Sequence, residues 1–200
     1  FMLDKISPVA LEGLGGGSLN LNALGPIFGV ADLLLDADGE DAIAIVNTSA
    51  VAGFTQLRRI DTATGEQTPL GSFNTLKRVT VGRDGLIYAH DGAKVYCIKP
   101  DGTLGSATSS IPTPTALAYD DVKDELIVYS MPQKKITRLN KSLQVVDTWA
   151  IPTSFELAGD GSVTVNPFDG SVWLSETYKS STSGRSMNLM NCTASALCLE

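Results

Sequence analysis

The chain has few aromatic residues and few residues of the chemically reactive types. Of its 200 residues, 6% are aromatic, three are cysteine and one is histidine. We expect no membrane span, because aspartates interrupt the most apolar stretch before it reaches the roughly 18 apolar residues of a membrane helix. The odd cysteine count excludes a complete disulfide framework. Lys and Arg number 15 against 22 Asp and Glu, and this net charge of −7 argues against nucleic-acid binding, which depends on clustered cations.

The composition is otherwise that of a globular chain with a core. Hydrophobic residues make up 43% of the chain and charged residues 18%, a balance that excludes disorder. The 19 glycines and nine prolines are many for a helical bundle. An all-β fold is therefore favoured.

Four copies of one pattern divide the chain. In each copy a polar turn that contains Asp precedes a short apolar strand, and the strands recur about every 40 to 46 residues, within the range of propeller blades. The turn and strand pairs are residues 38–41 and 42–46, 83–85 and 86–88, 121–125 and 126–129, and 168–170 and 171–174. Further apolar segments before and after each pair repeat in phase, which gives room for four strands per copy.

Four short antiparallel strands per repeat are the build of a β-propeller. We predict four visible blades at residues 25–73, 74–112, 113–152 and 153–200, after a segment at 1–24 that is either a closing strand or a linker. The blades form either a complete four-bladed ring or part of a larger propeller. A β-sandwich is the alternative, although it does not predict four phased copies.

Three stretches combine an Asp-Gly turn with apolar strand residues: 79–88 (VTVGRDGLIY), 94–102 (KVYCIKPDG) and 165–176 (VNPFDGSVWLSE). They resemble the repeats of NHL, gluconolactonase-like, virginiamycin-lyase-like and quinoprotein-type propellers. The resemblance is to the repeat and not to one member, and such repeats carry unrelated functions. It implies a metal held by inner strands in lactonase-like members and histidine chemistry in lyase-like members. This chain offers neither set, unless further blades carry the site.

The connections between second and third strands should share one face with the connections between blades. They span residues 47–54, 90–93, 130–134 and 176–185, and long loops on a rigid scaffold often bind ligands. The candidate binding residues are His90, Asp91, Glu176, Tyr178, Lys179 and Arg185. His90 could also be a general base, although no nucleophile motif accompanies it, and residues 180–184 could instead be a mobile polar loop.

We predict a non-catalytic binding or interaction module that presents these loops to a protein, peptide or glycan. One alternative is a partial lactonase- or lyase-like propeller enzyme. Another is a structural half-propeller that completes its ring as a homodimer. Three Asn-X-Ser/Thr triplets, at residues 47, 140 and 191, together with the low charge, favour an extracytoplasmic protein.

Two smaller features suggest a metal site and a disulfide. Asp36, Asp38 and Asp41 surround a glycine turn and could bind calcium, or could simply form an acidic hairpin turn. Their spacing is one residue short of the arrangement in calcium-binding propeller repeats. Cys192 and Cys198 could close a small loop as a disulfide, which would leave Cys97 as the free thiol.

Overall fold

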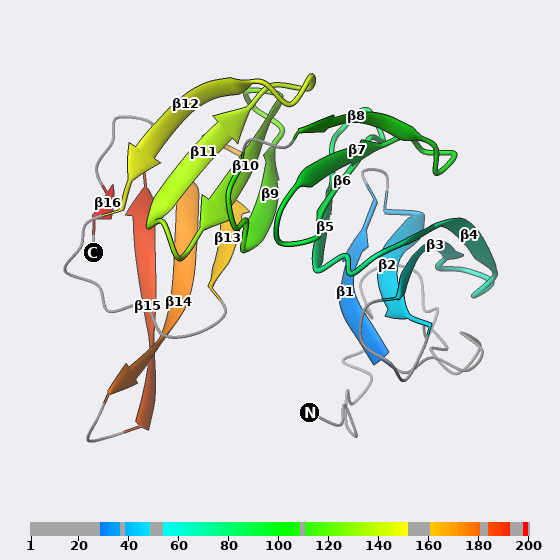
Figure 1. Ribbon diagram of the computed structural model, residues 1–200, viewed down its shortest axis with the longest axis horizontal. Helices are drawn as coiled ribbons and strands as arrows, with labels where there is room; N and C mark the ends of the chain where they lie inside the picture. Colours follow the sequence, from blue (N-terminus) through cyan, green and yellow to red (C-terminus); the bar gives the residue numbers. More distant parts are fainter. Residues whose placement is uncertain are drawn as a thin grey trace.

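The computed structural model describes residues 29–36, 39–48, 54–108, 111–151, 161–180, 184–192 and 198–199. These residues form sixteen β-strands in four antiparallel sheets of four strands each. In every sheet the strands follow one another in chain order (Figure 1). The all-β, propeller-like fold predicted from the repeats is confirmed, and each sheet is called a blade below.

The first two blades occupy the N-terminal half of the described chain. The first blade consists of β1 (Gly29–Leu35), β2 (Asp41–Asn47), β3 (Thr55–Asp61) and β4 (Gln67–Phe73). The second consists of β5 (Arg78–Val81), β6 (Ile87–His90), β7 (Val95–Ile98) and β8 (Leu104–Thr108).

The third and fourth blades follow in the same order. The third consists of β9 (Ala116–Asp120), β10 (Glu125–Ser130), β11 (Lys135–Leu139) and β12 (Val145–Ala150). The fourth consists of β13 (Ser162–Val165), β14 (Val172–Ser180), β15 (Gly184–Cys192) and β16 (Cys198–Leu199). No helix occurs in the described residues, and hence none that could cross a membrane.

The core lies between the blades, which pack face to face. Ile43 and Ile45 of β2 pack against Ile87 of the second blade, and Leu174 of the fourth blade packs with Ile127 of the third. Strands buried on both faces are read in a sequence as continuous apolar runs. This explains why residues 42–46 and 126–129 are apolar throughout instead of alternating with polar residues.

The connections between strands lie on two opposite faces. The turns that join first to second and third to fourth strands lie on one face, here called the turn face (upper side of Figure 1). The loops that join second to third strands and blade to blade lie on the other, here called the crossover face. The predicted sharing of one face by these loops is confirmed. The inner strands β1, β5, β9 and β13 pack in succession along the arc of blades.

The two ends of the arc differ in polarity. No comparable packing joins β1 to β13 in the described residues. On the outer face of the first blade, Leu33 and Leu35 are 40% and 38% exposed. On the outer face of the fourth, Ser162 and Thr164 are exposed, and the Ser162 and Ser175 hydroxyls lie 2.6 Å apart. The outer face of the first blade is not open throughout, because Ala42, Ala44 and Val46 of β2 are buried. Homodimerisation stays a prediction, which light scattering of the purified chain tests.

Residues 176–185 do not form the long loop that the sequence predicted. β14 continues to Ser180 and β15 begins at Gly184, and the two strands stay paired over this whole stretch. Thr and Tyr favour extended backbone, and each residue from Val172 to Ser180 has a partner in β15 in the strand register. The connection itself is therefore short, at residues 181–183, which lie outside the described residues. The hairpin projects beyond the other strands of its blade (Figure 1).

Candidate functional site

His90, the histidine predicted to bind or to act as a base, lies at the end of β6 and is fully buried. Its Nδ1 accepts a hydrogen bond of 3.1 Å from the Gly92 N–H, and its Nε2 is buried without a partner. Burial lowers the pKa of His90 to about 4, with a smaller contribution from the charges of Lys77 and Arg78, and outweighs the Thr115 backbone and Asp91, which raise it. The ring is therefore neutral at physiological pH and does not reach the surface.

Asp91 shapes the loop that follows His90. One carboxylate oxygen accepts hydrogen bonds from the N–H groups of Ala93 and Lys94, at 2.7 and 2.8 Å, and the other accepts the Tyr96 hydroxyl at 2.6 Å. Burial raises the pKa of Asp91, but these hydrogen bonds outweigh burial and leave the pKa below its usual value. The carboxylate is thus engaged in holding its own loop.

The remaining candidate binding residues lie on the hairpin of the fourth blade. Glu176 is opposite Asn188 in the strand register, Tyr178 opposite Ser186, and Lys179 opposite Arg185. His90 and Asp91 belong to the second blade. The structure therefore does not bring the predicted binding residues together in one site.

The aspartates of the first turn are partly engaged within the protein. Asp36 Oδ1 accepts the Asp41 N–H at 3.2 Å, and the Asp41 carboxylate forms an ion pair with Arg59 at 3.2 Å. Asp38 lies outside the described residues. Within the part of the chain that the structure describes, no group of three or more His, Cys, Asp or Glu side chains could hold a metal ion. Calcium binding at this turn stays a prediction.

Cys192 and Cys198 lie directly opposite each other in the pairing of β15 with β16. Opposed residues of an antiparallel pair have Cα atoms about 4.5 to 5.5 Å apart, within the range that a disulfide bridges. We expect the unreduced, denatured chain to react with one maleimide, at Cys97, and the reduced chain with three. Mass spectrometry gives the count, and three labels without reduction would contradict the disulfide.

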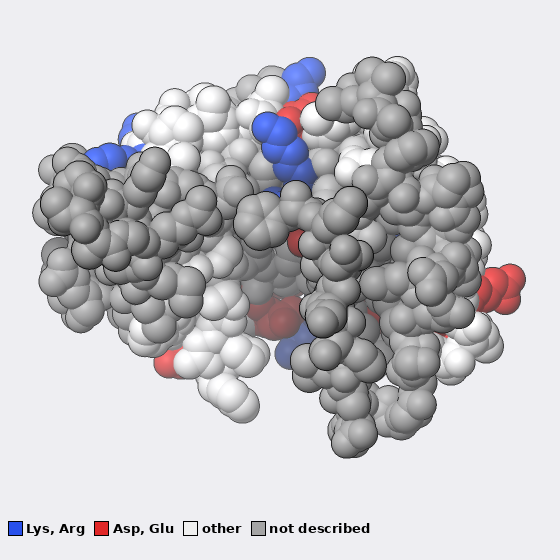
Figure 2. Space-filling model, turned by 90° about the horizontal axis from the view of Figure 1, so that it is seen from below, with Lys and Arg blue, Asp and Glu red and all other residues white. Residues whose placement is uncertain are grey.

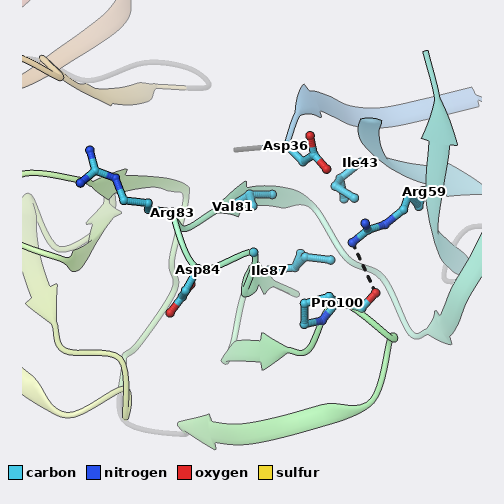
Figure 3. Close-up of a pocket in the computed structure, with 9 residues that line it drawn as sticks. Asp36, Ile43, Arg59, Val81, Arg83, Asp84, Ile87 and Pro100 are labelled. Atoms are coloured by element: carbon cyan, nitrogen blue, oxygen red, sulfur yellow. Dashed lines mark hydrogen bonds between the residues drawn. The ribbon is translucent and has the colours of Figure 1, made fainter. Parts of the chain in front are cut away.

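A cavity of about 360 Å³ lies between the first and second blades on the turn face (Figure 3). Its floor is apolar and its rim carries charge. The apolar residues are Ile43, Val81, Ile87 and Pro100, and the others are Asp36, Arg59, Arg83, Asp84 and Gly85. The cavity is lined by residues of two consecutive blades, from Asp36 of the first to Pro100 of the second.

Arg59, on β3 of the first blade, lines one side of this cavity. Its guanidinium donates to the Asp41 carboxylate at 3.2 Å and to the Pro100 carbonyl at 3.4 Å, the bond drawn in Figure 3. Its Nε is buried and has no acceptor within the protein. A buried donor without a partner is costly.

The cavity lies beside a turn position that is proline in the second blade and lysine in the third. The turns after β7 and β11 match, because Lys99 N–H donates to Thr103 and Asn140 N–H donates to Gln144. Pro100 therefore corresponds to Lys141 in the next blade. Lys141 spans the groove between the second and third blades, with its Nζ 2.9 Å from Asp84 and 2.7 Å from Asp124. Pro100 has no such side chain, and the groove between the first and second blades stays open.

Sequence reasoning missed the cavity because it examined the loops of the crossover face. The signal that could have found it is the Pro100 position, where an alignment of the third-to-fourth-strand turns shows a proline against a lysine. The signal is weak in isolation, since the cavity also requires Ile43 and Arg59 from another blade.

Comparison with known proteins supports the fold and nothing finer. A scan against protein-family models finds no match, and a search of curated proteins finds none. Solved structures do match. A protein of unknown function from Desulfotomaculum acetoxidans is 12% identical with a TM-score of 0.59, over 86% of this chain and 54% of that one.

Two further structures agree. Hydrazine synthase from Kuenenia stuttgartiensis is 14% identical with a TM-score of 0.63, over 88% of this chain and 49% of that chain. A protein of unknown function from Bacteroides thetaiotaomicron is 15% identical with a TM-score of 0.59, over 86% and 43%. The chain thus spans about half the length of the structures it matches, and the similarity concerns the fold alone.

Proposed function

We propose that this chain is a non-catalytic binding module whose ligand site is the cavity between the first and second blades. The observation that carries this proposal is an apolar floor beside the guanidinium group of Arg59. Ligand sites are typically pockets of about 300 to 1,000 Å³ with apolar walls and a few convergent polar groups. The volume of about 360 Å³ suits a small group and not a large cofactor.

The lining indicates which chemical group would enter. An apolar side chain of the ligand that displaces water from Ile43, Val81 and Ile87 would make the binding free energy more favourable. An N–H group of the Arg59 guanidinium would donate to an acceptor placed next to that side chain. An extended peptide offers both groups in one residue, namely an apolar side chain and its own main-chain carbonyl. A short peptide is therefore the proposed ligand.

The proposal includes no chemical step. None of the nine residues that line the cavity is Ser, Cys or His, so the usual nucleophiles and the usual neutral-pH base are not placed there. A lyase-like mechanism would depend on the imidazole of His90, which is buried at the opposite end of β6. A binding function fits this lining better than an enzymatic one.

Selection from a displayed library of random peptides tests the proposal. Peptides enriched on the wild-type chain should bind the variants Val81→Phe, which fills the cavity, and Arg59→Met, which removes the donor, at least about tenfold more weakly, a loss of about 1.4 kcal/mol. Fluorescence anisotropy gives the affinities, and thermal melting verifies that each variant is folded.

Lys99→Gln is the matched control, because Lys99 is exposed in the same turn as Pro100 but does not line the cavity. It should leave peptide affinity unchanged. Equal affinity of the peptides for all four proteins would contradict the proposal, as would a selection that yields no peptide above background.

A further inference from the structure

The crossover face is basic, although the chain as a whole carries a net charge of −7. The cations lie in or beside the connections of the second and third blades. They are Lys77, Arg78, Lys94, Lys134 and Lys135. In the described residues of this face's connections, Asp91 is the one acidic residue. Figure 2 looks onto this face, and most of its Lys and Arg side chains lie along one side of the view.

The turn face carries the opposite charge. Acidic residues begin or occupy its turns because Asp accepts the N–H groups that a tight turn leaves free. In the described turns they are Asp36, Glu40, Asp41, Asp61, Glu66, Asp84, Asp101, Asp120, Asp121, Asp124, Glu125 and Asp169. Among described residues every ion pair involves these carboxylates: Arg59 with Asp41, Arg138 with Glu125, and Lys141 with Asp84 and Asp124.

Three lysines of the crossover face are available to a partner. Lys77, Lys94 and Lys135 are exposed, and none of them takes part in an ion pair between described residues. The Arg78 guanidinium donates to the carbonyl groups of Ala31 and Lys77 and lies near the Asp32 carboxylate, so the three lysines carry the charge available to a partner. The Asp91 carboxylate accepts two hydrogen bonds from its own loop and one from the Tyr96 hydroxyl of β7.

The two faces act as separate electrostatic surfaces. Strands of four to seven residues separate them in the first three blades, a length of about 13 to 23 Å. Exposed charges are largely screened beyond about 8 Å at physiological salt. An anion at the crossover face is therefore attracted by the nearby lysines, and the distant carboxylates of the turn face scarcely repel it.

We propose that the crossover face of the second and third blades docks a short acidic segment of a partner polypeptide. The lysines come from different connections and therefore offer separate point charges, which suit carboxylates spaced along an extended segment. A long polyanion would extend past this area, and the net charge of −7 would repel the parts that do so. This surface is distinct from the cavity, which opens on the turn face.

Binding of a fluorescent peptide that alternates Glu and Gly, measured by anisotropy, tests the proposal, with a Gln and Gly peptide as the neutral reference. The double variant Lys94→Gln and Lys135→Gln should weaken binding about fivefold, since each exposed ion pair contributes modestly. Raising the salt from about 0.05 to 0.15 M should weaken binding to the wild type more than binding to the variant.

The double variant Lys99→Gln and Lys123→Gln is the matched control. It removes the same charge from exposed lysines of the turn face, so it should change the affinity by less than about twofold. Equal losses in both double variants would overturn the proposal, because they would indicate a response to net charge alone. Tighter binding to heparin or to anionic lipid vesicles than to the acidic peptide would also overturn it, as would self-association of the chain that the acidic peptide does not displace.

Discussion

Replacing Gly102 with alanine is expected to lower the free energy of unfolding by at least about 3 kcal/mol. Gly102 lies in the turn between β7 and β8 with φ at 86°, a backbone conformation that residues with a side chain rarely adopt. A Cβ atom there would lie 2.6 Å from the carbonyl carbon and 2.8 Å from the Cα of Leu70. Leu70 belongs to β4 of the first blade, so the clash is with backbone and no side-chain rotation relieves it.

Gly65→Ala provides the matched control. Gly65 occupies the corresponding turn of the first blade with φ at 75°, and nothing lies within 4 Å of a Cβ built on it. It should therefore cost about 1 kcal/mol for the left-handed backbone alone. Urea denaturation of the three proteins measures both losses. Similar losses for the two variants would contradict the close approach of Gly102 to β4.

The contact of Gly102 with Leu70 also bears on the cavity. Pro100, which lines the cavity, precedes Gly102 in the same turn, and its carbonyl accepts a hydrogen bond from Arg59 of the first blade. The turn is thus held to the first blade at two points. We infer that the close approach of Gly102 helps to fix the width of the cavity.

Acidification is expected to destabilise the protein between about pH 6.5 and pH 4 through His90. The pKa of His90 is lowered from 6.5 to about 4 by burial in the folded state. Within this window the unfolded chain binds a proton that the folded protein does not, so the free energy of unfolding falls as the pH falls. The full shift corresponds to about 3 kcal/mol. Above pH 6.5 both states are neutral at this residue and the effect vanishes.

The measurement is direct, because the chain contains one histidine. Its ring-proton resonance can be followed by NMR without further assignment, and we expect a midpoint near pH 4. The variant His90→Asn keeps an acceptor for the Gly92 N–H but does not titrate in this range, so its stability should depend less steeply on pH. A midpoint near 6.5 in the folded protein would contradict the buried, neutral imidazole.

Much of the fold could be predicted from local sequence patterns. The Asp-containing turns at 83–85 and 168–170 and the apolar runs that follow them mark strands that the structure contains. Such turns are readable because Asp and Gly meet local backbone requirements, whatever packs around them. The hairpin at 176–185 was misread as a loop, because its polar composition hides a pairing that depends on the partner strand.

The candidate site was less predictable than the fold. His90 is polar and close to a turn, yet it is fully buried and lies near the Thr115 backbone, a neighbour that no local pattern predicts. The cavity needs Arg59 and Pro100, 41 residues apart in the chain, to meet across two blades. Both features depend on which residues become neighbours in space, and the sequence of a single repeat does not show its contacts with other blades.

The sequence by itself determined that the chain is all-β, that it repeats four times and where its tight turns lie, because these features depend on residues close together in the chain. The tertiary structure alone decided that the proline at position 100 leaves a cavity and that the net charge of −7 divides into an acidic turn face and a basic crossover face. The physical reason is that a cavity and a charged surface are formed by neighbours in space. The packing of the blades decides which residues become neighbours, whereas the composition gives only the total for the whole chain.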